Sequence, residues 1–288
     1  MPDSSSLVRL RMDLAYDGTH FSGWASQPGR RTVQQTVEQA WGVLLRDLAP
    51  TTTVGGRTDA GVHARASVVH LDIPLRQWQA LPGRSTRSPE QAALRRLAGV
   101  LPEDIVVRSV RVAPAGFDAR FSALHRRYSY RLNDRPESAD PLRRHDTVHL
   151  KRPVDELRMN EAARALLGLR DFAAFCRKRA GATTTRTLLR FEVVRDPDGV
   201  VVAHLEADAF CHSMVRSLVG AVVPVGEGRR EPAWPAEVMR AGARNPGVTV
   251  MPAHGLCLEQ IVYPPESELA ARAQTTRSRR DGLEGRSI

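Results

Sequence analysis

Apolar and polar residues alternate near the start of the chain. In the segment LVRLRMDLAY, residues 7–16, every second residue from Val8 on is apolar, and Arg9, Arg11 and Asp13 lie between them. Alternation with a period of two predicts a β-strand that buries one face, here Val8, Leu10, Met12, Leu14 and Tyr16. The first element is therefore expected to be a half-buried strand.

Residues 32–48 follow a helical period instead. Their apolar positions recur every three or four residues, at Val33, Val37, Ala40, Trp41, Leu44, Leu45 and Leu48. Thr32 and Gln35 form a T-x-x-Q pattern, which predicts a capping box at the start of this helix. A second helix is expected after Ser88, with Pro89 in the first position and Gln91 completing its cap.

Strand patterns surround these helices, at residues 51–54, 67–73 and 104–112. The order of elements is therefore β-α-β-β-α-β, and the second half of the chain repeats it. Its strand at residues 125–132 precedes a helix at 153–168, a hairpin turning at 196–199, helices at 211–226 and 232–244, and a strand at 255–264. This order predicts an α+β fold of two ferredoxin-like (RRM-like) halves.

We expect two mostly antiparallel sheets side by side, with an active-site cleft between the halves. The predicted domains are residues 1–113, which carry a Gly-rich loop, and residues 114–264. Residues 265–288 are polar with almost no core-forming side chains, which predicts a disordered tail.

Composition narrows the class of protein. The longest apolar run, residues 218–225, is too short to span a membrane, and the N-terminus lacks the basic and apolar regions of a secretory signal. The three cysteines are scattered and form no CxxC pair, so neither a disulfide framework nor a zinc knuckle is indicated. We expect a cytoplasmic protein without a membrane segment.

The formal net charge of +10 favours a polyanionic partner such as nucleic acid. The strand RRYSY places Tyr128 and Tyr130 on one face with Arg126, and sheets use such faces to hold unstacked bases. The alternative is that these tyrosines pack in a core. Arg177, Lys178 and Arg179 are candidate contacts to RNA phosphates, or simply a solvated charge run.

The segment GGRTDAGVHARA, residues 55–66, is too Gly-rich for a regular helix or strand. A P-loop is excluded because Val62 and His63 stand where its Lys and Ser or Thr should be. His63 and His70 lack the spacing of a metal site. A lone carboxylate, Asp59, remains as a candidate nucleophile or base, and a nearby guanidinium such as Arg57 favours the ionised form of a carboxylate. An ordinary turn with a surface Arg–Asp pair is the alternative.

The nine residues GRTDAGVHA resemble the active-site signature of the tRNA pseudouridine synthase A family. The resemblance extends over residues 7–264 and includes YDGTHFSGW, TVQQTVEQA, FDARFSALHRRYSYRL, FCHSMVRSLVG and GLCLEQIVYP. It implies that Asp59 is the catalytic aspartate and that Tyr128, rather than Tyr130, stacks on the target uracil. It also implies uridines 38 to 40 of the tRNA anticodon stem-loop as substrate, no cofactor and no metal, and a homodimer.

The chemistry of this family suits a single carboxylate. Pseudouridylation breaks the bond between N1 of uracil and C1′ of ribose and rejoins the base through C5, with no net redox change. The carboxylate can act at C1′, on the 2′-proton or at C6, and the sequence leaves these open. Arg57 would orient Asp59, and Arg216 is a candidate contact to a phosphate or carboxylate. Three positions depart from the usual family pattern, Ala25, Ser67 and Ala98, which bear on loop support and tRNA fit.

Two other classes of function fit part of the pattern. A non-catalytic RNA-binding protein with tandem RRM-like halves would explain the charge and the tyrosines, but it gives Asp59 no role. A metal-dependent nuclease would lose activity with a chelator.

Overall fold

A computed structural model describes residues 6–46, 49–177 and 183–284, with side chains to residue 278. The chain divides into two compact units, the first comprising Met1–Leu124 with Gln260–Ile288 and the second His125–Glu259. The first unit therefore extends to Leu124 and not only to residue 113, and it also includes the C-terminal residues from Gln260 on. Two hydrogen bonds join the two parts of the first unit. Leu124 N donates to Val262 O at 2.8 Å, and Tyr263 Oη donates to Ala119 O at 2.6 Å.

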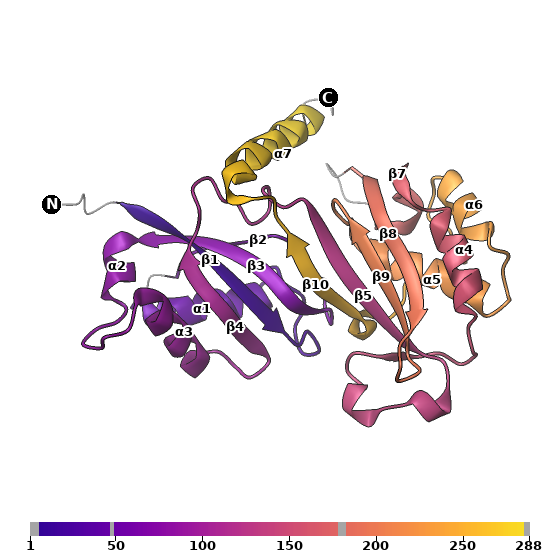
Figure 1. Ribbon diagram of the computed structural model, residues 1–288, viewed down its shortest axis with the longest axis horizontal. Helices are drawn as coiled ribbons and strands as arrows, with labels where there is room; N and C mark the ends of the chain where they lie inside the picture. Colours follow the sequence, from indigo (N-terminus) through magenta and orange to yellow (C-terminus); the bar gives the residue numbers. More distant parts are fainter. Residues whose placement is uncertain (1–5, 47–48, 178–182, 285–288) are drawn as a thin grey trace. The chain divides into compact units, whose positions relative to one another are not determined.

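The first unit is built on antiparallel strands (Figure 1). Its elements are β1 (Leu7–Tyr16), α1 (Val33–Leu44), β2 (Thr52–Val54), β3 (His63–Pro74), α2 (Leu75–Ala80), α3 (Pro89–Val100) and β4 (Ile105–Val112). β1 pairs with both β3 and β4, and β2 pairs with β3. Leu10, Met12, Leu14 and Tyr16 are buried on one face of β1, so the predicted alternation is confirmed.

The start of α1 differs from the expected capping box. Thr32 is the N-cap residue, but its side chain makes no capping bond, and its buried Oγ1 has no hydrogen-bond partner among the described residues. The first helical N–H groups bond to backbone instead: Val33 N donates to Gly23 O at 3.2 Å and Gln34 N to Trp24 O at 2.9 Å. The preceding segment therefore supplies the acceptors that a capping side chain would otherwise provide. The box predicted at Ser88 and Gln91 is present at the start of α3.

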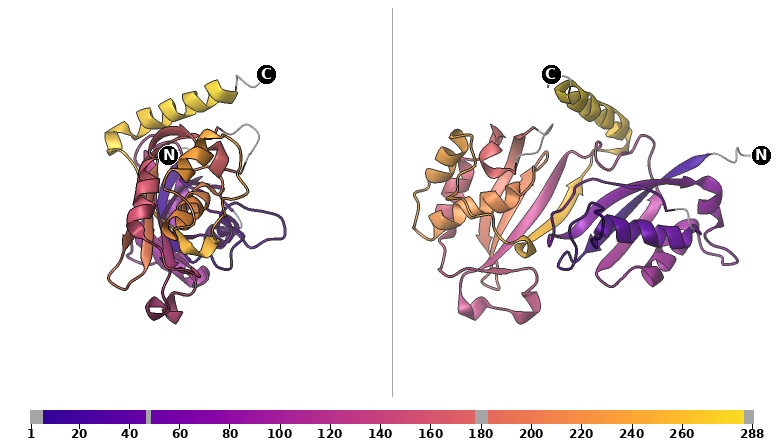
Figure 2. Two further views of the ribbon diagram at one scale, coloured as in Figure 1. Left: turned by 90° about the vertical axis from the view of Figure 1, so that its right-hand side faces the viewer. Right: turned by 180° about the vertical axis from the view of Figure 1, so that it is seen from behind.

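The second unit also has mainly antiparallel strands (Figure 2). Its strands are β5 (His125–Asn133), β6 (Val148–His149), β7 (Gly168–Asp171), β8 (Thr185–Arg195) and β9 (Val201–Ala207). Its α-helices are α4 (Glu156–Arg164), α5 (Met214–Gly226) and α6 (Trp234–Arg240), and its short 3₁₀ helices are η1 (Pro136–Ser138), η2 (Pro141–Arg143), η3 (Ala173–Phe175) and η4 (Ala253–Gly255). The last strand, β10 (Leu256–Val262), crosses the boundary between the units along the chain.

Strand order in this unit is β5-β9-β8-β7, with β6 parallel to β5. The predicted hairpin turn at 196–199 is confirmed, since Gly199 N donates to Asp196 O at 2.9 Å. Asn160 fastens α4 to the sheet, because its side chain donates to Val193 O and accepts from Val193 N. α5 is almost wholly buried. The fold is therefore α+β with mostly antiparallel strands, as expected. No helix among the described residues is long and apolar enough to cross a membrane.

The C-terminal residues correct the expectation of a disordered tail. They form η5 (Glu266–Glu268) and α7 (Leu269–Glu284). Leu269 and Ala273, one helical turn apart, are 2% and 1% exposed. The Arg277 guanidinium donates to Asp118 at 2.6 Å. Burial acts to raise the pKa of Asp118, but backbone N–H donors, His70 and Arg277 outweigh it and hold this pKa below its usual value. Two buried apolar residues and one ion pair therefore anchor the helix, although the segment as a whole is polar.

Deletion of residues 266–288 is expected to destabilise the first unit. It exposes the surface that Leu269 covers, and it leaves the buried Asp118 without its guanidinium partner. The loss should be at least about 2 kcal/mol in the free energy of unfolding, the value of one buried leucine. The measurement is the urea midpoint of the deleted chain against a control chain ending at Ser278, which keeps both contacts. Equal midpoints would show that α7 contributes nothing to stability.

Candidate active-site loop

The Gly-rich loop joins β2 to β3 in the first unit and is fastened where it begins. Gly55 N donates to Val68 O at 2.8 Å. A Cβ at Gly55 would lie 2.6 Å from both Ala119 O and the Tyr263 hydroxyl oxygen. Only glycine fits this position without displacing its neighbours. The first residue of the loop is therefore closely packed against Ala119 and Tyr263.

The segment after β1 holds the middle of the loop on both sides of Asp59. Trp24 N donates to Thr58 O at 3.1 Å, and Gly61 N donates to Phe21 O at 3.2 Å. The hydroxyls of Tyr16 and Thr58 share a buried hydrogen bond of 2.8 Å. These bonds at Thr58 and Gly61 hold the backbone on either side of Asp59. Because Gly23 and Trp24 also accept from the start of α1, one segment connects that helix to the loop.

Glycine is required at two points of this contact. Gly23 has a φ of +91°, and a Cβ there would lie 2.9 Å from Thr58 O and 3.1 Å from Ala60 N. Gly61 has a φ of +77° and lies within the turn closed by the bond from Val62 N to Asp59 O, 3.1 Å. Both backbones lie in the left-handed region that favours glycine. The close approach of the two segments explains the Gly-rich composition of this part of the sequence.

Asp59 is half-buried at the turn, between buried Thr58 and exposed Ala60, and Arg57 is exposed. The two residues that the sequence analysis selected in the loop therefore differ in environment. A carboxylate on a backbone held from both sides can be presented to a ligand with little loss of conformational freedom.

The two histidines near the loop serve its structure. His63 Nδ1 accepts from Gly18 N at 3.0 Å, and His70 Nδ1 accepts from Ala119 N at 3.0 Å. Burial lowers the pKa of His70, which favours the neutral ring that such an acceptor needs. No cluster of three or more metal-ligating side chains occurs in the part of the chain that the structure describes.

The second unit carries the other selected residues. Tyr128, on β5, is 7% exposed, and its ring meets the Phe210 ring at a centroid distance of 5.2 Å and an angle of 84°. Tyr130 is fully buried and donates its hydroxyl to Pro252 O at 2.6 Å. Burial raises the pKa of Tyr130. Tyr130 therefore fits the core-packing alternative, and Tyr128 pairs with an aromatic ring that sequence reasoning did not single out.

Arg216 lies in the first turn of α5 and is half-buried. Its Nε donates to Met251 O at 2.6 Å, and Met251 N donates to Arg216 O at 3.3 Å. Arg216 thus binds the carbonyl of Met251, and Tyr130 binds the carbonyl of the next residue, Pro252. Arg177 is exposed, and its backbone N donates to His212 O at 3.0 Å. Lys178 and Arg179 lie outside the described residues.

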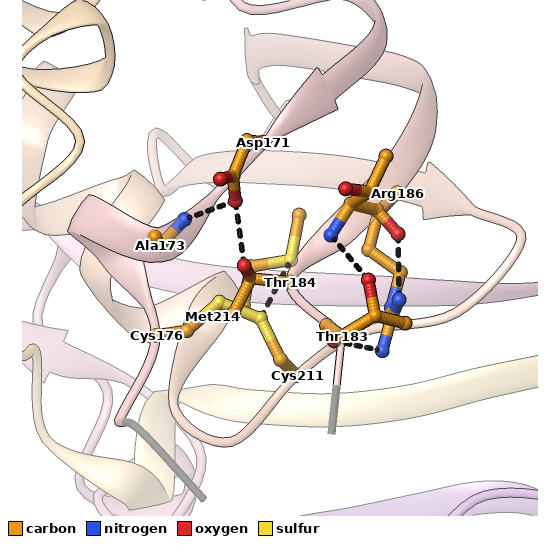
Figure 3. The surroundings of a disulfide bond; sticks show 9 residues. Asp171, Ala173, Cys176, Thr183, Thr184, Arg186, Cys211 and Met214 are labelled. Carbon is orange, nitrogen blue, oxygen red and sulfur yellow. Dashed lines mark hydrogen bonds between the residues drawn. A yellow bond between two sulfur atoms is a disulfide. The ribbon is translucent and has the colours of Figure 1, made fainter. Parts of the chain in front are cut away.

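The structure contains a cysteine pair that the sequence did not indicate. Cys176 and Cys211 are joined by a disulfide, although 35 residues separate them in the sequence (Figure 3). Cys176 follows η3, and Cys211 lies between β9 and α5. Their spacing matches no short motif, so only the tertiary structure could reveal the pairing. Cys257 is free.

Comparison with known proteins adds independent information. The family model described as tRNA pseudouridine synthase matches residues 162–264. A tRNA pseudouridine synthase A of Frankia casuarinae is 56% identical over 96% of this chain and 96% of its own length. Proteins of the same name from Streptomyces griseus and Streptomyces avermitilis are 53% and 50% identical, over 94% and 95% of this chain and 93% and 94% of their own lengths.

Proposed function

Because this chain belongs to the tRNA pseudouridine synthase A family and is an isomerase that converts uridine to pseudouridine in tRNA, we propose that Asp59 is its catalytic carboxylate. The same proposal assigns uridines 38 to 40 of the anticodon stem-loop as the sites of reaction. The observation that carries it is the loop itself. Its backbone is bonded at Thr58 and at Gly61, on either side of Asp59, and Asp59 is half-buried.

Each remaining site residue has a role in this proposal. Tyr128 stacks on the uracil that leaves the tRNA helix, since an aromatic face binds any exposed base. Arg57 orients the Asp59 carboxylate. Arg216, held through its Nε, contacts a phosphate of the tRNA or a carboxylate of the site.

The larger arrangement is also a proposal. We propose two ferredoxin-like halves whose sheets bring Asp59 and Tyr128 to one uridine, a homodimer, and a cytoplasmic location where tRNA is modified. The net charge of +10 supports binding of a polyanion.

The direct test uses one transcribed tRNA with uridine at positions 38 to 40. After incubation with the protein, the RNA is digested and every pseudouridine is mapped to its position. We expect isomerisation within these three positions. Pseudouridine elsewhere would disprove the proposed site selection. Bound but unchanged RNA would indicate the RNA-binding alternative, and cut RNA would indicate a nuclease.

The hydrogen bond between Tyr16 and Thr58 gives a further prediction. Tyr16→Phe keeps the ring but leaves the buried Thr58 hydroxyl without this partner. Because the loop is then less firmly held, kcat should fall about tenfold while the KM for tRNA stays unchanged. Thr58→Ser retains a hydroxyl and is the matched control, which should keep near-normal turnover. Steady-state kinetics on the same tRNA make the comparison, and an unchanged kcat in Tyr16→Phe would remove this bond from the positioning of Asp59.

A further inference from the structure

One cysteine of the disulfide, Cys211, is next in sequence to Phe210, the aromatic residue that contacts Tyr128. Cys211 directly follows Phe210, whose ring packs against Tyr128, and three residues later α5 begins. Cys176 lies at the end of η3, and its Cα is 5.8 Å from that of Cys211. This separation falls within the range that an S–S bond spans without backbone movement. The bond thus ties the segment 208–213 to a second segment of the same unit (Figure 3).

Other contacts in this region do not depend on the S–S bond. Arg177 N donates to His212 O at 3.0 Å, and Asp208 accepts from Thr187 N at 3.1 Å. Cys211 Sγ lies 3.7 Å from the buried Met214 Sδ, which can accept weakly from a thiol when the disulfide is reduced. These contacts support the local fold in both the reduced and the oxidised protein. The S–S bond therefore changes mainly the conformational freedom of the segment between Asp208 and His212.

We propose that Cys176 and Cys211 form a reversible thiol–disulfide pair whose oxidation lowers the turnover of the synthase. The proposal rests on the proposed role of Tyr128. A uracil that stacks on Tyr128 has to share this ring with Phe210, so the segment bearing Phe210 has to adjust when the base enters. The disulfide restrains that segment through the neighbouring residue, Cys211. A disulfide in a protein of a reducing compartment is typically transient and redox-sensing, which fits a regulatory pair.

The oxidant is a low-molecular-weight disulfide such as glutathione disulfide. Cys211 is half-buried and Cys176 is 3% exposed, so the Cys211 thiolate attacks first. This step forms a mixed disulfide and releases one glutathione thiolate. The Cys176 thiolate then attacks the Cys211 sulfur, forms the protein disulfide and releases the second glutathione. Two protein thiols are oxidised, one glutathione disulfide is reduced, and the two thiol protons go to the released thiolates.

The experiment uses the full-length chain with Cys257→Ser, so that only the pair remains. Fully reduced protein is treated with glutathione disulfide, and its free thiols are counted under denaturing conditions. Pseudouridine formation is then measured on the same samples, before and after dithiothreitol. We expect both thiols to be lost, kcat/KM to fall about tenfold, and dithiothreitol to restore it. Retention of both thiols, or equal activity in the two states, would overturn the proposal.

Two variants in the same background identify the residues. Cys211→Ala should abolish the response to the oxidant, and Cys176→Ala should stop at a mixed disulfide on Cys211, visible as an added glutathione mass. If the buried Cys176→Ala variant fails to fold, Cys211→Ala decides the question alone. A full loss of activity on oxidation of Cys211→Ala would show that the pair is not responsible.

The outcome is separable from that of the proposed function. Thiol counting reports on the pair without any assay of activity, and the activity is read as a ratio between two states of one protein. Asp59 and Tyr128 are tested in the reduced protein only. Wild-type activity of the Tyr128 variants would remove the proposed stacking role, whereas the thiol count would still establish or exclude the reversible disulfide.

Discussion

Asp59→Asn is expected to abolish pseudouridine formation, while the protein still folds and still binds tRNA. The amide has almost the same shape as the carboxylate, but it is neither basic nor nucleophilic. The loop backbone on either side is held by Trp24, Phe21 and the Tyr16–Thr58 bond, none of which involves the Asp59 side chain. Binding of tRNA should persist, because it rests on many arginines and on base stacking.

The measurement is release of tritium from tRNA labelled at C5 of uridine, run beside a binding titration at fixed salt. That hydrogen has to leave when C5 becomes the glycosidic atom. Asp198→Asn is the control, since this exposed carboxylate lies in the β8–β9 hairpin turn. Activity of Asp59→Asn within about tenfold of wild type, a barrier change of only ~1.4 kcal/mol, would show that Asp59 is not the catalytic group.

Replacements of Tyr128 are expected to separate stacking from proton transfer. If the ring serves as a platform, Tyr128→Phe keeps uridine binding and Tyr128→Ala loses about 1–3 kcal/mol, the range for stacking of a base on an aromatic ring. If the hydroxyl takes part in proton transfer at C5, Tyr128→Phe lowers turnover at unchanged affinity. Binding titrations and single-turnover rates on the same tRNA distinguish the two.

Tyr130→Phe is the matched control on the same strand. Its hydroxyl donates to Pro252 O in the core, so its loss should lower the free energy of unfolding by about 1 kcal/mol and leave turnover unchanged. Wild-type activity in both Tyr128 variants would remove Tyr128 from the site.

Local patterns predicted most elements correctly. The alternation along β1, the Ser88 cap of α3 and the hairpin turn at 196–199 depend on neighbouring residues only. Such features are encoded by backbone geometry and by the periods of strands and helices, which a single sequence displays. The signature around Asp59 is likewise continuous in the sequence, and it led to the family that the relatives show.

By itself, the sequence determined the order of most strands and helices, the family, and the residue types that its chemistry requires. The tertiary structure decided three features that depend on residues distant in the chain. Carbonyls of Gly23 and Trp24 replaced the expected Thr32 cap, buried Asp118 anchored a C-terminal helix that composition suggested was disordered, and Cys176 met Cys211. In each case the partner is a backbone acceptor, a charge or a thiol from a distant part of the chain. Only folding brings the two residues into contact, so no local period or spacing in the sequence predicts the contact.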